Sequence, residues 1–391
     1  MLRKLGRVLL IAFVILLAVT ALAAAASAVA NSRLPRASAD PQQLNPAEQA
    51  CVAEFFHAQN ALGDRVWPGF GRADIPVVLY NETTVFLVGP HDPVPGWQPM
   101  PNGRRQGGAW EPLPDGVEGL PAFRQPLPAS GATPQSFTVR VGDQWAASLT
   151  TLEWMRIGLA DEIRSDLPPA VAAVFPFSLF LNQLVSGSDQ FISLIAHEAF
   201  HAFQGQVAPE RLAAAEAALS QEGAYPWDET SDAWAVELDL LASALQAETD
   251  EAAKARTAEF LAARTERRAT GKLSAAQVDF EQQREWLEGL ARYAELAIWR
   301  EAAADPDYRP VAALSGDPDF DDYRGYSDRW EREIDQMRRM AGQPGEGRLY
   351  YSGMAIAMLL DRVQPDWKDR AFDPGITLDG LLAESVAGAA E

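Results

Sequence analysis

The 391-residue chain has one cysteine, Cys51, and only four histidines, and its 54 acidic side chains outnumber its 33 basic ones. A single cysteine excludes an internal disulfide bond. The formal net charge of −21 leaves nothing to neutralise the phosphates of a nucleic acid, so we expect no nucleic-acid partner. A charge of this size is typical of a well-solvated surface, and the length suffices for a large core in one or two units.

One long apolar run is present, at the N-terminus. Basic residues at positions 3, 4 and 7 precede the apolar stretch 8–19, and an alanine-rich run ends in Ala28-Val29-Ala30. This order is typical of a secretory signal peptide, although the whole stretch 8–30 is long enough to span a bilayer if it is not cleaved. We therefore expect 1–30 to be a signal peptide or signal anchor. The rest of the chain is then extracytoplasmic, secreted or anchored, and meets a membrane only through this segment if it stays uncleaved.

Two of the four histidines lie in the segment 191–206, FISLIAHEAFHAFQGQ, in the order His-Glu-x-x-His. Residues four apart share one face of an α-helix, so His197 and His201 can bind one metal ion. Glu198 lies beside them, where it can accept a proton from water at the metal. The apolar residues around the motif predict a buried helix. The alternative is a core helix whose two histidines only form hydrogen bonds.

Strand-like segments precede this helix, and helical patterns follow it. The segments 75–89 and 136–152 each predict two strands joined by a turn, 46–62 predicts a helix, and the Pro- and Gly-rich stretch 89–134 predicts one long irregular excursion. Further helices are expected at 210–221, 232–247, 251–269, 274–303, 329–340, 353–363 and 378–386. The sequence therefore predicts an α+β fold with the metal helix at the junction. A linker at 31–45 precedes a strand-containing part at 46–187 and a mostly helical part at 188–391.

A zinc site needs a third protein ligand and an open position for water. The other histidines, His57 and His91, lie far upstream, which leaves carboxylates on later helices. Glu288 is followed by Gly289 in mid-helix, where glycine costs about 1 kcal/mol relative to alanine. A glycine there is explained if another helix, such as the one that carries the histidines, must cross very close to the ligand. Glu288 is therefore the expected third ligand.

Two alternatives to Glu288 as a ligand remain open. Its helix carries other charged residues at spacings of three, four or seven, a pattern that is also typical of a solvated face: Glu281, Glu285, Arg292 and Glu295. Glu237 lies on an apolar stripe, where a carboxylate needs a buried partner. That partner can be the metal, the free N–H of a ligand histidine, or an arginine such as Arg264 or Arg268.

His-Glu-x-x-His followed by the later stretch EGLARY resembles the gluzincins, zinc metallopeptidases whose third ligand is a glutamate on a helix. The resemblance implies a zincin-like fold, Zn²⁺ held by His197, His201 and Glu288, and Glu198 as general base. The sequence departs from the thermolysin-like pattern, which has Asp four residues after the ligand glutamate, where this chain has Arg292. The two stretches are also much farther apart here than in that pattern.

The remaining catalytic role is a hydrogen-bond donor to the oxyanion. Tyr350 and Tyr351 are candidates, and Tyr351 is the one we assign. The sequence thus predicts an exported zinc-dependent hydrolase, foremost a peptidase acting on a peptide or protein substrate. A zinc amide hydrolase of cell-wall peptide is an alternative, and so is a non-catalytic extracytoplasmic binding or assembly protein that retains the helix. We expect Glu288→Ala to weaken zinc binding, and Glu285→Ala and Glu295→Ala to leave it intact.

Overall fold

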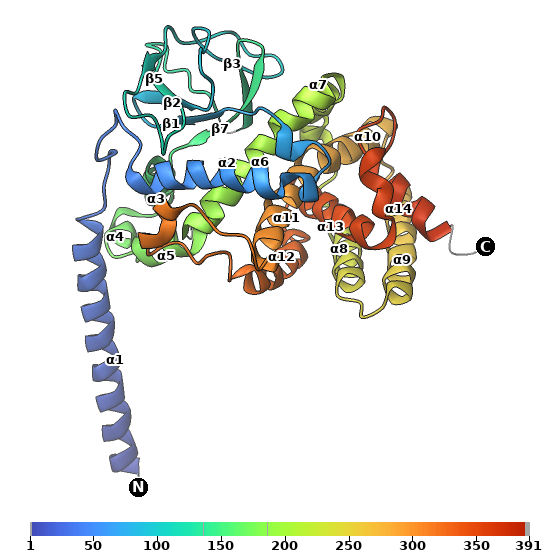
Figure 1. Cartoon of the computed structure of the whole chain (residues 1–391). Coiled ribbons are helices and arrows are strands. Elements are labelled where there is room, and N and C mark those ends of the chain that lie inside the picture. The colour runs from blue at the N-terminus through green and yellow to red at the C-terminus, as the bar shows by residue number, and fades with distance from the viewer. Residues whose placement is uncertain (1, 136, 186, 388–391) are drawn as a thin grey trace.

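The computed structural model describes residues 2–135, 137–185 and 187–387. Within these residues the fold is α+β, with one sheet of seven strands and many helices. Figure 1 shows the sheet at one end of the molecule, helices α2 and α6 crossing below it, and the C-terminal helices gathered beyond α6. The α+β class predicted from the sequence is confirmed.

The strands are β1 (Val77–Tyr80), β2 (Thr84–Val88), β3 (Gln98–Pro99), β4 (Glu111–Pro112), β5 (Ala122–Pro126), β6 (Phe137–Val141) and β7 (Gln144–Thr150). The helices up to the His-Glu-x-x-His segment are α1 (Leu2–Asn31), α2 (Pro46–Val66), α3 (Leu152–Asp166), α4 (Pro169–Ala172), α5 (Phe177–Leu184) and α6 (Gly187–Val207). The later helices are α7 (Pro209–Ala218), α8 (Ser231–Leu245), α9 (Asp250–Thr270), α10 (Ala275–Arg284), α11 (Leu290–Ala304), α12 (Tyr326–Met340), α13 (Gly347–Val363) and α14 (Leu378–Ala387).

The strand order in the sheet is β3-β6-β7-β1-β2-β5-β4. β1 is parallel to β7, and the other neighbouring strands are antiparallel. Val77 pairs with Val88 of β2 on one side and with Ala147 of β7 on the other. Both predicted strand pairs, β1–β2 and β6–β7, are therefore confirmed. β6 and β7 are the strands that pack against α6, the helix with the histidine motif.

Side chains alternate between the two faces of the sheet, as the period of a strand requires. In β1, Val77 and Leu79 join the large core that includes α2 and α6, whereas Val78 and Tyr80 join a smaller core on the other face. The segment 89–134 covers that second face and buries Trp97 there. The prediction of a wholly irregular excursion is wrong, because the segment contains β3, β4 and β5. Two-residue strands such as β3 and β4 are too short to leave a periodic signal.

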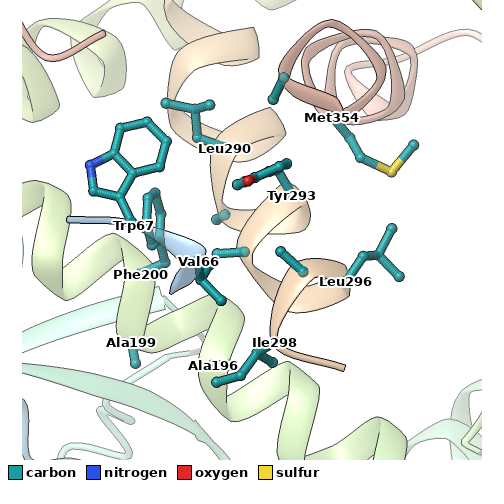
Figure 2. Packing of buried hydrophobic residues seen from close by; sticks show 14 of the residues in the cluster. Val66, Trp67, Ala196, Ala199, Phe200, Leu290, Tyr293, Leu296, Ile298 and Met354 are labelled. Atoms are coloured by element: carbon teal, nitrogen blue, oxygen red, sulfur yellow. The ribbon is translucent and has the colours of Figure 1, made fainter. Parts of the chain in front are cut away.

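α6 is the central helix of the large core. Figure 2 shows Ala196 of α6 beside Ile298 of α11, and Phe200 of α6 beside Trp67. The rings of Trp67 and Phe200 meet edge to face at 5.3 Å between centroids. Burying an aromatic side chain of this size contributes about 2–3 kcal/mol, and most apolar residues of α6 are buried in this way. The predicted buried helix is confirmed, and this packing fixes the direction in which its histidines point.

The predicted helix at 274–303 is confirmed as α10 and α11, which are joined by a π-helical turn, Glu285–Gly289. Ser274 caps its start and forms a capping box with Gln277, as its position before the helix indicated. A Cβ at Gly289 would lie 2.5 Å from the Cα of Gly353, so glycine is required there. The helix that passes so close is α13, not the histidine helix α6 that the sequence led us to expect.

The N-terminal helix α1 projects away from the rest of the molecule (Figure 1). Its segment Phe13–Asn31 is long and apolar enough to cross a membrane, and none of it is buried within the molecule. α1 could therefore be a signal or an anchor. In the segment after it, Ser38 donates from its backbone N–H and its hydroxyl to Glu82, both at 2.7 Å. Cys51 is free and fully buried in α2.

Candidate metal centre

Three side-chain atoms converge at the middle of α6. His197 Nε2 and His201 Nε2 lie 3.2 Å apart, and Glu288 Oε2 lies 3.6 Å from the first and 3.3 Å from the second. Tetrahedral coordination with bonds of 2.0–2.1 Å places ligand atoms roughly 3.3–3.4 Å apart. The three atoms therefore match the edges of one tetrahedral site. This buried group could hold a metal ion.

Glu288 is brought to the histidines by the π-helical turn, a local widening of the helix that is frequent at functional sites. Its two carboxylate oxygens have different partners. Oε1 accepts a hydrogen bond from Arg284 Nη2 at 2.8 Å, whereas Oε2 faces the two histidines. Arg284 is also paired with Glu216 and Glu346. This arrangement holds the carboxylate so that one oxygen faces the two histidine nitrogens.

His201 is oriented by Gln204, one turn further along α6. Gln204 Oε1 lies 3.0 Å from His201 Nδ1 and accepts its hydrogen, which leaves Nε2 free to bind a metal. The Gln204 amide in turn donates to the carbonyl oxygens of Trp286 and Leu287, at 2.8 and 3.2 Å. Gln204 therefore ties the histidine helix to the turn that carries Glu288. Its only signal in the sequence is a polar residue three positions after His201 and seven after His197, on the same face of the helix.

His197 is oriented by Glu295 of α11, whose Oε2 lies 3.4 Å from His197 Nδ1. Glu295 is held by two arginines, Arg292 Nη1 at 3.2 Å and Arg329 Nη2 at 3.0 Å. A carboxylate that binds the outer nitrogen of a ligand histidine fixes the orientation and tautomer of the ring. The contact gives a reason to revise the expectation that Glu295→Ala leaves zinc binding intact, because Glu295, seven residues after Glu288, lies on the side of the helix that faces the histidines.

Glu295→Gln is expected to weaken metal binding by about 10–100-fold, the usual effect of losing a carboxylate that supports a ligand histidine. Glu333→Gln is the matched control. Glu333 pairs with the same two arginines, Arg292 and Arg329, but does not contact His197. Competition with a chromophoric chelator measures both affinities. Equal losses in the two variants would mean that the arginine network matters only for the fold and that Glu295 does not position the histidine.

Glu198 lies beside the histidines with a buried carboxylate, and its Oε2 has no hydrogen-bond partner among the described residues. Buried polar groups normally have partners, so an unpaired carboxylate oxygen beside a cavity is a sign of a functional group. Burial raises the pKa of Glu198 to about 8, although the neighbouring His197 opposes this shift. A carboxylate with a raised pKa is a stronger base, as proton transfer near neutral pH requires.

The charges around the three converging atoms stabilise one another. Burial disfavours a charged Glu288, yet His201, His197 and Arg284 together hold its pKa well below the usual range. Burial likewise opposes a charged His197, but the hydrogen bonds to Glu288 and Glu295 raise its pKa to about 10. Burial lowers the pKa of His201. A metal ion binds neutral histidine, so binding at this centre must displace the proton of His197.

The centre opens into a cavity of about 340 Å³. Its wall includes Phe137 of β6, whose ring lies 4.6 Å from the ring of His201, and Tyr350 of α13. Tyr351, the residue assigned from the sequence as oxyanion donor, is not on this wall. Its hydroxyl accepts a hydrogen bond from Arg292 at 3.0 Å. Burial and the nearby Glu288 carboxylate raise the pKa of Tyr350, so its hydroxyl remains a donor.

The alternatives to Glu288 have other partners. Glu237 is fully buried and pairs with Arg264 at 3.2 Å and with Arg267, far from the two histidines. The solvated-face interpretation of the glutamates from α10 to α11 is wrong. All four carboxylates are buried and paired with arginines: Glu281, Glu285, Glu288 and Glu295. His57 and His91 are exposed and take no part in the centre.

Comparison with known proteins finds no family model, no curated protein and no solved structure that matches this chain. The function therefore has to be inferred from the geometry of the centre.

Proposed function

We propose that the chain is an exported zinc-dependent hydrolase of the gluzincin type, with a zincin-like fold and a peptide or protein substrate. The observation that carries the proposal is the triangle of His197 Nε2, His201 Nε2 and Glu288 Oε2, with sides of 3.2–3.6 Å, which fits three ligands of one zinc ion. Two histidines and one glutamate also make up the ligand set of catalytic rather than structural zinc sites, which leave one position open.

The surroundings of the triangle also favour catalysis over a purely structural metal. A cavity reaches the ligands, and the unpaired carboxylate of Glu198 lies on its wall. Structural zinc sites are closed by four protein ligands and need neither feature. The helix α6 packs on β6 and β7 of the sheet, an arrangement in line with a zincin-like fold.

Each residue of the centre has one role in this proposal. Zn²⁺ held by the two histidines and Glu288 would act as a Lewis acid and would lower the pKa of water to about 7. Glu198 accepts the proton of the attacking water, because its carboxylate is unpaired and its pKa is raised. Tyr350, rather than Tyr351, is placed to donate a hydrogen bond to the oxyanion. Gln204 and Glu295 keep the two histidine rings in position.

The test combines metal analysis with an unbiased substrate search. The purified protein is stripped with a chelator, reloaded with zinc and incubated with a proteome-derived peptide library, and the products are identified by mass spectrometry. About one zinc per chain is expected, together with internal peptide cleavages that disappear on stripping and return on reloading. Protein that takes up no zinc, or cleavages that persist without it, would contradict the proposal.

A further inference from the structure

The exposed apolar side chains outside α1 are concentrated in one place. Eight large apolar residues beyond α1 are exposed among those the structure describes, and five of them belong to α4, α5 and the link between them: Val171, Val174, Leu179, Phe180 and Leu184. The other three are scattered at positions 94, 207 and 236. Leu179 is 70% exposed, and a cluster of exposed apolar side chains of this kind is unusual on a surface that faces water. We call these five residues the α4–α5 face.

The composition of this segment sets it apart from the rest of the chain. No charged residue occurs between Asp166 and Asp189, although about a fifth of all residues are charged. This is the longest uncharged stretch after α1. The helix α5 is apolar on both sides. Phe177 and Leu181 are buried against α3, whereas Leu179, Phe180 and Leu184 point outward. The outer side of α5 also carries the exposed polar residues Ser178 and Asn182, but its three large apolar side chains form a cluster of the kind that marks a contact site.

The α4–α5 face lies where α1 leaves the body of the molecule. Asn31, the last residue of α1, donates its side-chain amide to the carbonyl oxygens of Ala173 and Phe175, at 3.1 and 2.8 Å. Leu34 packs against the buried side of the same segment. Figure 1 shows α4 and α5 beside the end of α1 that is nearest the body. The apolar face and the apolar helix are therefore parts of one continuous surface.

We infer that α1 is retained as a membrane anchor and that the α4–α5 face rests in the lipid surface where α1 emerges from the bilayer. The basic residues at positions 3, 4 and 7 precede the span, which leaves the body on the far side of the membrane. A body with a net charge of −21 is not attracted to anionic lipid, so charge does not hold it at the membrane. The contact is therefore apolar, and its partner is the acyl chains at the membrane interface. The inference does not depend on the metal centre.

Two features of the structure support retention of α1. Ala28, Val29 and Ala30, the small residues of the cleavage pattern, lie within the helix, and Asn31 directly after them is bonded to α4–α5. No residue of Phe13–Asn31 is buried within the molecule, so most of its apolar surface is available to lipid, apart from the end that contacts α5.

A fluorescent probe on the α4–α5 face tests the contact in the full chain. Leu179→Cys and Phe180→Cys are labelled with an environment-sensitive dye and placed in phosphatidylcholine nanodiscs. Val236→Cys is the matched control. Val236 is an exposed apolar residue of α8, a helix that lies away from α1 in Figure 1. The unsubstituted chain controls for Cys51, which is fully buried and whose thiol pKa is raised by burial to about 12, so that it resists labelling.

The emission of the probes at positions 179 and 180 is expected to shift to the blue. Nitroxide-labelled lipid should quench most of this emission, whereas iodide in the aqueous phase should not quench it. The probe at position 236 should show the opposite pattern. An aqueous response at all three positions would overturn the inference. The inference would also be overturned if the probes were shielded from iodide but not quenched by lipid, and Leu179→Cys formed cross-linked pairs. That result would show that a second copy of the chain covers the face. Intact mass of the membrane-bound protein should include α1, and a chain that begins at Asn31 would contradict retention.

Discussion

Glu198→Gln is expected to reduce kcat by about 10²–10⁴-fold and to leave about one zinc bound per chain. The amide matches the carboxylate in shape but cannot accept a proton. Glu198 is not one of the three converging ligand residues, so the metal site should remain intact. The measurement is hydrolysis of the best peptide from the library digest, with zinc content determined on the same preparation.

Glu210→Gln is a suitable control for this variant, because it makes the same isosteric change at an exposed position on α7. It should hydrolyse the peptide at the wild-type rate. A Glu198→Gln protein that retains zinc and full activity would show that another group accepts the proton. A Glu198→Gln protein that loses its zinc would show that Glu198 belongs to the ligand set.

Glu288→Ala is expected to weaken zinc binding by about 10²–10³-fold. Structural zinc sites with four ligands bind with roughly 10–16 kcal/mol, so one ligand is worth about 3–4 kcal/mol. The variant should still fold, because Arg284 keeps Glu216 and Glu346 as partners when Glu288 is removed. Zinc affinity is measured by chelator competition, and folding is checked by circular dichroism and thermal unfolding of the zinc-free proteins.

Glu285→Gln is the matched control for this prediction. Glu285 lies in the same π-helical turn and is equally buried, but it pairs with Arg264 and faces away from the histidines. Its substitution should lower stability and leave the zinc affinity of the folded protein unchanged. If Glu288→Ala binds zinc as tightly as the Glu285→Gln control, Glu288 is not a ligand.

The part of the centre that depends on local sequence was predictable. His197, Glu198 and His201 lie within a single turn and a half of α6, where helical periodicity alone sets their relative positions. Glu288 was found from a different signal, the cost of Gly289 in mid-helix. That reasoning led to the carboxylate that the structure places beside the two histidines, but for a partly wrong reason, because the close neighbour of Gly289 is Gly353 of α13 rather than α6.

The supporting residues could not be predicted, because their roles depend on tertiary contacts. Gln204 is held by carbonyl groups of the π-helical turn, a contact that the sequence of α6 alone does not indicate. Glu295 lies 3.4 Å from His197 Nδ1 only because α11 packs against α6. Tyr350 and Tyr351 are adjacent in the sequence, and only the orientation of α13 decides which one faces the cavity. The strands of 89–134 were missed for a similar reason, since pairing partners rather than local periodicity define such short strands.

The most direct test of the metal centre is an anomalous difference map from crystals of the zinc-loaded protein, recorded at the zinc absorption edge. We expect a single strong peak about 2.0–2.2 Å from His197 Nε2, His201 Nε2 and Glu288 Oε2, with density for a water at the fourth position. A map with no peak among these three atoms, or a zinc held by other residues while Glu288 stays with Arg284 alone, would contradict it.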